Sequence, residues 1–131
     1  MIVFKYKKNE SGISRPVADI KLKVNNLEVG VAMYIDSGAD ISMIPRGTGE
    51  LLGFQKAPGE KIKEMHGIAG GGVPYLEKEV VMIFGKKNLK IKISWALIEE
   101  VPPLLGRKDI FSRFRITFDE ARDVIEFKEK R

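Results

Sequence analysis

Two carboxylates, a hydroxyl and a glycine lie together in the stretch Asp36-Ser37-Gly38-Ala39-Asp40. The apolar segment 27–35 runs directly into this stretch, and a second apolar run, 41–44, follows it and is stopped by Pro45. A chain that turns so quickly between two buried strands forms a tight loop, where a small hydroxyl residue and a glycine relieve backbone strain. A carboxylate held there is costly unless it has partners or does chemistry. The residues alone leave two interpretations open: an Asx turn with exposed acids, or a functional carboxylate.

The elements that position this loop are predicted to be mostly β-strands. Residues of strand-forming type alternate between apolar and polar over many short segments. We expect strands over 2–7, 17–24, 27–35, 41–44, 60–65, 73–84, 89–95, 116–118 and 124–127. Asn25-Asn26 predicts a two-residue hairpin turn that delivers Asp36 to the end of the next strand, because Asn tolerates positive φ.

Two short helices are expected beside these strands. The first covers 46–53, with Leu51 and Leu52 facing inward and Gly53 at its end. The second covers 108–114 and is expected to bury its apolar residues, which are Ile110, Phe111 and Phe114. Residues 99–103 form a loop, since proline cannot supply ladder hydrogen bonds.

Composition predicts one domain over residues 1–131, with an apolar share of 44% that is ordinary for a globular chain. Apolar runs stay shorter than the ~18 residues of a membrane span, so we expect no membrane partner. Zero cysteines exclude a disulfide framework and a thiolate metal site, and we expect a cytoplasmic protein. The net charge of +5 comes from interleaved Lys and Glu, which favours a solvated surface over nucleic-acid binding.

Three stretches carry a resemblance to a known family. Asp36-Ser37-Gly38-Ala39-Asp40 resembles the Asp-Thr/Ser-Gly-Ala-Asp signature of retropepsin-like aspartic proteases. Met65-His66-Gly67-Ile68-Ala69-Gly70-Gly71-Gly72 resembles the glycine-rich flap tip of that family, and Leu104-Leu105-Gly106-Arg107 resembles its apolar-apolar-Gly-Arg element. The resemblance covers roughly residues 15 to 120. It implies a retropepsin-like closed β-barrel with a flap hairpin, one or two short helices, and aspartic endopeptidase activity.

Aspartic endopeptidases use two carboxylates that share one proton and hold a water between them, without metal or cofactor. This sequence offers one Asp-Ser-Gly, at Asp36. The other aspartates outside the motif lack the Ser-Gly that follows Asp36; they are Asp19, Asp109, Asp119 and Asp123. The resemblance therefore implies a homodimer in which each subunit contributes one catalytic Asp36 to hydrolysis of a peptide or protein substrate.

The resemblance also implies roles for further positions. Ser37 would bond across the dimer to the partner's loop, and Gly38 would let the backbone approach the substrate. Asp40 would contact substrate backbone and pair with Arg107, for which the plainer interpretation is a surface cation. The positions expected to contact substrate are Tyr34, Gly67, Ile68, Ala69, Val101 and Pro102.

Two alternatives to the endopeptidase remain open. A non-catalytic homodimeric peptide-binding module of the same fold would hold extended peptides by strand addition under the flap. A two-carboxylate glycosidase using Asp36 and Asp40 is disfavoured, because both acids lie on one tight turn instead of flanking a cleft. Peptide cleavage at acidic pH would separate these functions.

Overall fold

The computed structural model describes residues 1–66 and 71–130. Within these ranges the chain forms one α-helix and a series of strands, which confirms the expected mostly β fold. In chain order the elements are β1 (Ile2–Lys5), β2 (Lys7–Lys8), β3 (Ser14–Arg15), β4 (Val17–Val24), β5 (Leu27–Ile35), β6 (Ser42–Ile44), α1 (Arg46–Leu51), β7 (Lys63–His66), β8 (Gly72–Phe84), β9 (Lys87–Ala96), β10 (Leu104–Leu105), β11 (Phe114–Asp119) and β12 (Val124–Glu129).

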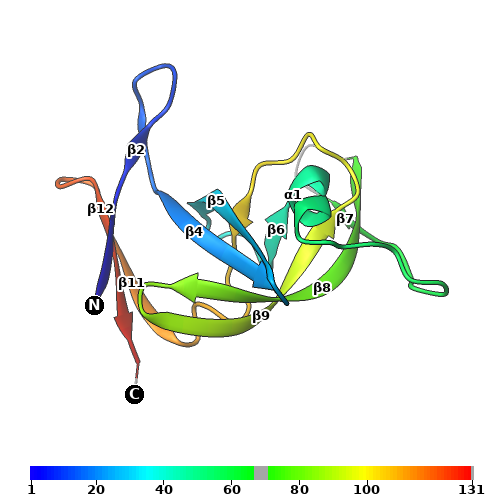
Figure 1. The fold of residues 1–131 in the computed structure, drawn as a ribbon. Helices are drawn as coiled ribbons and strands as arrows, with labels where there is room; N and C mark the ends of the chain where they lie inside the picture. Colours follow the sequence, from blue (N-terminus) through cyan, green and yellow to red (C-terminus); the bar gives the residue numbers. More distant parts are fainter. Residues whose placement is uncertain (67–70, 131) are drawn as a thin grey trace.

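The central sheet closes on itself as a barrel, as expected. Its strand order is β4-β5-β10-β6-β9-β8-β7, and an additional antiparallel pairing of β4 with β8 closes the ring (Figure 1). Strand β7 lies outside the ring and pairs only with β8 among the described residues, so these two strands form a projecting hairpin.

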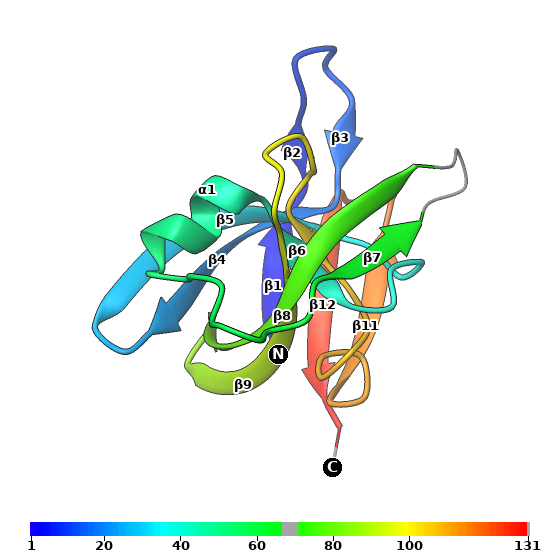
Figure 2. The same ribbon diagram turned by 90° about the vertical axis from the view of Figure 1, so that its right-hand side faces the viewer.

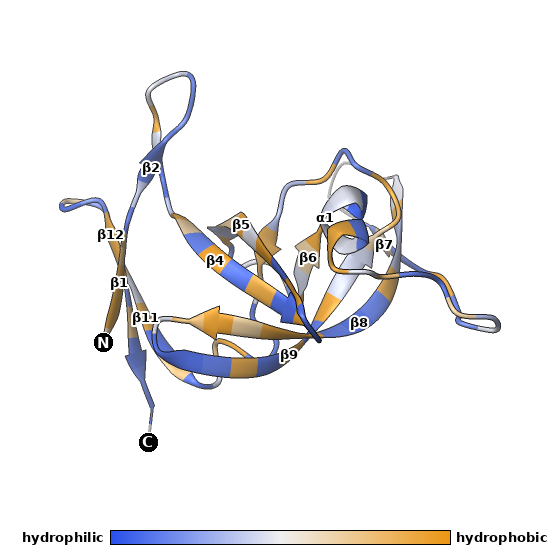
Figure 3. Cartoon of the chain, in the orientation of Figure 1, coloured by the Kyte–Doolittle hydropathy of each residue, from blue (hydrophilic) through white to orange (hydrophobic). Residues whose placement is uncertain are grey.

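The barrel interior is built by period-two alternation along the strands. In β4 the side chains of Ala18, Ile20 and Leu22 are buried, while those between them are exposed. Figure 3 shows the same alternation as hydrophobic and hydrophilic bands along β4. Because successive strand residues point to opposite faces, the pattern fixes which face of each strand lines the core.

A second sheet, in the order β1-β12-β11, joins the two ends of the chain. Its inner face carries a cluster of aromatic rings centred on Phe127, which lies 4.6 Å from Phe84 of β8 and 5.8 Å from Phe114 (ring centroids). The edge-on contact with Phe84 attaches the terminal sheet to the barrel, while that with Phe114 lies within the terminal sheet. The hairpin β2–β3 projects away from both sheets (Figure 1).

Local turn chemistry agrees with the sequence in several places. Asn25 has a φ of 54° in the turn between β4 and β5, and Gly53 has a φ of 81° just after α1, both as predicted. The strand expected over 2–7 is interrupted at Tyr6, whose backbone N–H donates to the carbonyl of Asp123.

Two helix predictions need correction. Residues 108–113 form a run of turns and not a helix, because Asp109 adopts a φ of 67°, outside the helical region, and Phe114 already belongs to β11. Ile110 and Phe114 are nevertheless buried, as expected. Leu51, the last residue of α1, is 66% exposed, whereas Leu52, the C-cap that follows it, is buried; adjacent residues at a helix end cannot share one narrow inward face.

Candidate active site

The loop 36–41 begins where β5 ends, at the same end of the barrel as β10. Strand β10 runs parallel to β5, with Leu104 beside Tyr34 and Leu105 beside Ile35. On its other side Leu104 pairs antiparallel with Met43 of β6, so β10 lies between the two strands that enclose the loop. The backbone N–H of Ile35 donates to the carbonyl of Pro16, 2.9 Å away, which fixes the opposite edge of β5.

The segment that follows β10 holds the loop by main-chain hydrogen bonds. The N–H of Asp36 donates to the carbonyl of Leu105 at 3.0 Å. At the far end of the loop, the N–H of Arg107 donates to the carbonyl of Ala39 at 2.9 Å, and the N–H of Lys108 donates to the carbonyl of Asp40 at 3.0 Å. Because these bonds use backbone groups at both ends of the loop, its position does not depend on flexible side chains.

Gly106 lies where this segment crosses the loop. A Cβ at Gly106 would stand 2.6 Å from the carbonyl carbon and oxygen of Ile41, and 2.9 Å from the carbonyl oxygen of Ala39. Its N–H donates to the buried hydroxyl oxygen of Ser42, 3.0 Å away. Sequence reasoning missed Ser42; the available signal was a small polar residue inside the apolar run 41–44.

Asp36 is half-buried as a residue, and its carboxylate forms an Asx turn with its own loop. Its Oδ1 accepts the N–H of Gly38 at 2.9 Å, and Oδ2 has no donor among the described residues. The N–H of Ala39 donates to the carbonyl of Asp36 at 3.2 Å. One carboxylate oxygen is thus oriented by the loop, while the other can reach a water or a second acid.

Asp40 and Arg107 form an ion pair, as the resemblance implies, with Arg107 donating to Asp40 Oδ1. The side chain of Asp40 is 85% exposed and that of Arg107 is 54% exposed, so the pair adds little to stability. Ser37 and Gly38 are exposed. The functional roles assigned to these residues stay predictions.

Several of the expected substrate contacts lie beside this loop. Tyr34 is half-buried, and its N–H donates to the carbonyl of Pro103 at 2.9 Å, which joins it to the segment that carries Val101 and Pro102. Val101 is half-buried and Pro102 is exposed. The remaining positions, Gly67, Ile68 and Ala69, lie outside the described residues.

The loop carrying Val101 is anchored to α1, which the sequence did not predict. The N–H of Arg46 donates to the carbonyl of Ile98 at 3.1 Å, and the N–H of Gly47 donates to the carboxylate of Glu99 at 2.8 Å. A carboxylate that caps a helix from a distant loop has no local sequence signature, because the two partners are far apart in the chain.

The hairpin β7–β8 and the loop 36–41 project toward the same side of the barrel. In Figure 2 both lie at the right of the molecule, the loop in cyan below β7. Trp95 of β9 is 4% exposed, and its indole N–H donates to the carbonyl of Arg46 at 3.0 Å.

The carboxylates of three aspartates outside the loop have partners elsewhere in the chain. Asp19 pairs with Lys7, Asp109 accepts the backbone N–H of Lys92, and Asp119 binds Arg122. Asp123 has a φ of 52° in the turn before β12. Among residues 1–66 and 71–130, no cluster of three or more potential metal ligands occurs, and no helix is long and apolar enough to cross a membrane.

Comparison with known proteins identifies the fold. Neither a protein-family model nor a curated protein sequence matches the chain. Among solved structures, the chain is similar to a retropepsin-like aspartic protease from Rickettsia conorii, with a TM-score of 0.66, 22% identity, and coverage of 95% of this chain and 98% of that one. It is also similar to EIAV protease complexed with the inhibitor HBY-793, with a TM-score of 0.55, 19% identity, and coverage of 71% and 82%. The chain has the retropepsin-like fold.

Proposed function

We propose that the chain is an aspartic endopeptidase that works as a homodimer, with Asp36 of each subunit in one shared site. The observation that carries this proposal is the loop 36–40, which is held by main-chain hydrogen bonds. Asp36 in it is half-buried, and its Oδ2 accepts no bond from the described residues. Of the two similar solved structures, one is a retropepsin-like aspartic protease and the other is EIAV protease with an inhibitor, which supports a peptidase function here.

The second carboxylate is assigned to a second copy of the chain because no other aspartate is followed by Ser-Gly, and the carboxylates of Asp19, Asp109 and Asp119 have partners elsewhere. Asp40, the nearest in sequence, is paired with Arg107. A two-fold axis beside the loop would place the two Asp36 side chains face to face. Ser37, exposed beside Asp36, would then meet the partner's loop.

In the proposed reaction a water lies between the two carboxyl groups. Like charges about 3 Å apart cannot both ionise cheaply, so one carboxyl keeps its proton. The ionised Asp36 takes a proton from the water, which attacks the scissile carbonyl carbon. The protonated Asp36 polarises the carbonyl oxygen and then helps to protonate the leaving amine. No metal or cofactor takes part, and the cysteine-free composition is compatible with a cytoplasmic site of action.

Substrate would lie between the loop 36–41 and the hairpin β7–β8. Tyr34, Val101 and Pro102 are the described residues proposed to contact its side chains. Gly67, Ile68 and Ala69 are proposed to contact it from the hairpin by sequence position alone. Gly38, with no side chain, would leave its carbonyl accessible to the substrate backbone.

The test compares cleavage of a peptide library at acidic pH by the wild type and by Asp36→Asn. The variant keeps the shape of the side chain but cannot share a proton, so we expect activity to fall by about 100-fold or more. Asp19→Asn is the matched control, since it removes an exposed aspartate whose side chain pairs with Lys7. A statine-type transition-state mimic should inhibit the wild type.

Two results would contradict the proposal. Retention of about a tenth of wild-type turnover by Asp36→Asn would exclude Asp36 as a general acid or base. Tight binding of extended peptides by a wild type that cleaves none would identify the non-catalytic binding module instead.

A further inference from the structure

Lys78 occupies a position in β8 that the strand pattern reserves for apolar residues. Alternate residues of β8 face the barrel interior, and Leu76, Val80 and Met82 are 0–2% exposed. Lys78 shares their face, because residues two apart along a strand point the same way. Its side chain is 17% exposed. A lysine in this register is unusual, since burying its ammonium group is costly without partners.

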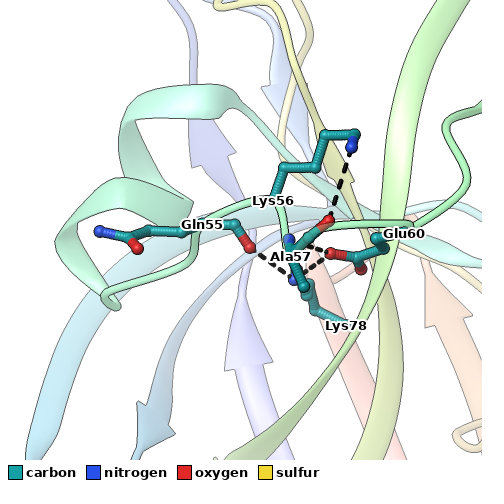
Figure 4. A network of polar contacts seen from close by, with 5 residues as sticks. All are labelled: Gln55, Lys56, Ala57, Glu60 and Lys78. Atoms are coloured by element: carbon teal, nitrogen blue, oxygen red, sulfur yellow. Dashed lines mark hydrogen bonds and ion pairs between the residues drawn. The ribbon is translucent and has the colours of Figure 1, made fainter.

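The partners of Lys78 come from the segment between α1 and β7 (Figure 4). Its Nζ donates to the carbonyl of Gln55 at 2.9 Å and to Glu60 Oε1 at 3.0 Å. Glu60 Oε1 also accepts the N–H of Ala57 at 2.9 Å. One ammonium group therefore joins two points of the connecting segment to β8.

Two aromatic rings complete the surroundings of the ammonium. Nζ lies 5.9 Å from the ring centre of Phe54 and 6.0 Å from that of Trp95, within the range of cation–π attraction. Trp95 is itself tied to α1 through its bond to Arg46. We call Phe54, Gln55, Glu60, Lys78 and Trp95 the Lys78 network.

The network lies at the base of the projecting hairpin. Segment 54–60 leads into β7, and β7 begins pairing with β8 at Lys63 opposite Tyr75, three residues before Lys78. Residues 54–62 belong to no helix or strand, so no ladder of backbone bonds holds them. Phe54 holds the start of the segment through its N–H bond to the carbonyl of Gly49 and its ring contact with Trp95. Among the described residues, the hydrogen bonds that join the segment to β8 come from Lys78.

Stability alone does not account for a charged group at this position. Replacing a largely buried ion pair by apolar side chains of similar volume is often neutral or stabilising, whereas the directional bonds of an ammonium specify geometry. Lys78 makes bonds in two directions to one segment, and an apolar residue could pack there but could not fix that segment.

We propose that Lys78 is a positioning residue for peptide binding: it fixes segment 54–60 to β8 and thereby sets the position of the hairpin β7–β8 above the loop 36–41. The inference rests on the proposed peptidase function. Lys78 acts through the hairpin and is not expected to contact the substrate or the reacting atoms.

The experiment compares four forms of the full chain: wild type, Lys78→Met, Lys78→Arg and Lys90→Met. Methionine keeps a long apolar side chain and removes the charge, while arginine keeps the charge and the donors. Lys90→Met is the matched control, since Lys90 forms an exposed pair with Glu79 at 3.8 Å, with side chains 72% and 57% exposed. Amide hydrogen exchange over 61–66, kcat and KM on a cleaved peptide, and the thermal unfolding midpoint are measured for each.

We expect Lys78→Met to raise exchange over 61–66 by about tenfold, as expected for loss of a hydrogen bond to a charged group. KM should rise by about five- to tenfold while kcat stays within about twofold, because uniform binding is lost and chemistry is kept. Lys78→Arg should restore much of both, and Lys90→Met should match the wild type.

The two halves of the experiment fail separately. Exchange over 61–66 in Lys78→Met equal to that in Lys90→Met would overturn the role of the network. Faster exchange with unchanged KM, or with kcat lowered and KM unchanged, would overturn the positioning role. A wild type without peptidase activity would refute the proposed function, and with it the link to peptide binding, while the exchange measurement still decides whether Lys78 fixes the hairpin.

Discussion

Gly106 is the residue at which one added methyl group would reach the main chain of the loop 36–41. A Cβ there would stand 2.6 Å from backbone atoms of Ile41, a distance that real Cβ atoms essentially never show. The atoms that this Cβ would meet belong to the main chain, which cannot make room by changing rotamer as a side chain can. The loop or β10 would have to move. Asp36 would be affected, because its N–H donates a hydrogen bond to the carbonyl of Leu105 in β10.

We therefore predict that Gly106→Ala lowers the free energy of unfolding by about 1–3 kcal/mol, as for other overpacked sites. Peptidase activity should fall by about tenfold or more, because small displacements of a reacting group are costly. Gly30→Ala in β5 is the control, since a Cβ there meets nothing within 4 Å. Chemical denaturation of both variants checks the difference, and equal stabilities would mean that the crossing is looser than its distances imply.

At the scale of elements, sequence predicted those structures whose cause is local. Asn25 adopts positive φ in a tight turn, and alternation in β4 assigns its buried face. The helix prediction for 108–114 was wrong because a single residue, Asp109, adopts a positive φ. The carboxylate of Asp109 accepts the N–H of Lys92 at 2.9 Å. That bond comes from a distant strand, so nothing in the local sequence indicates it.

Strand β10 and the Lys78 network likewise depend on contacts between distant residues, which the local sequence does not indicate. A strand of two residues has no period to detect, and β10 exists because β5 and β6 lie on either side of it. Lys78 left a visible sign, a lysine in an apolar register, but its partners Gln55 and Glu60 are defined only by the folded chain. Of the site, sequence predicted the loop 36–40 and the pair of Asp40 with Arg107, but not the support from Ser42.

The attachment of segment 54–60 to β8 is expected to depend on pH through Glu60. The N–H of Ala57 and the ammonium of Lys78 hold the pKa of Glu60 below its ordinary value of 4.5, with Lys56 adding to the effect. A carboxyl whose folded pKa is depressed stabilises the fold above its unfolded pKa, and the contribution is lost as pH falls through the folded value. The attachment of segment 54–60 should therefore persist through pH 4.5 and weaken only at lower pH.

Titration of the Glu60 carboxyl by NMR in wild type and in Lys78→Met checks this prediction. In the variant the pKa should move up toward 4.5 without reaching it, because the larger contribution, from Ala57, remains. Exchange over 61–66 should rise below the midpoint in the wild type. A Glu60 pKa that is unchanged by Lys78→Met would show that the ion pair does not form in solution.

At the scale of the whole molecule, one chain supplies half of the proposed site. The terminal strands β1 and β12 pair with each other within the chain, so the pairing itself does not indicate how a second copy binds. The proposed chemistry sets one condition on the dimer. Whichever surfaces meet, the two loops 36–40 must face each other across a two-fold axis. Activity of mixed subunits tests that requirement directly.

Suppose that wild-type subunits are mixed with Asp36→Asn subunits and allowed to exchange fully. If both carboxylates are needed, only dimers of two wild-type chains are active, so activity follows the square of the wild-type fraction. An equal mixture should then give about one quarter of the activity of undiluted wild type, whereas a chain that uses Asp36 alone would give about one half. Mixing with Asp19→Asn subunits is the control and should leave activity unchanged. Specific activity should also fall on dilution below the dimer dissociation constant. A linear mixing curve, with subunit exchange verified by mass-labelled chains, would exclude a site shared between two copies.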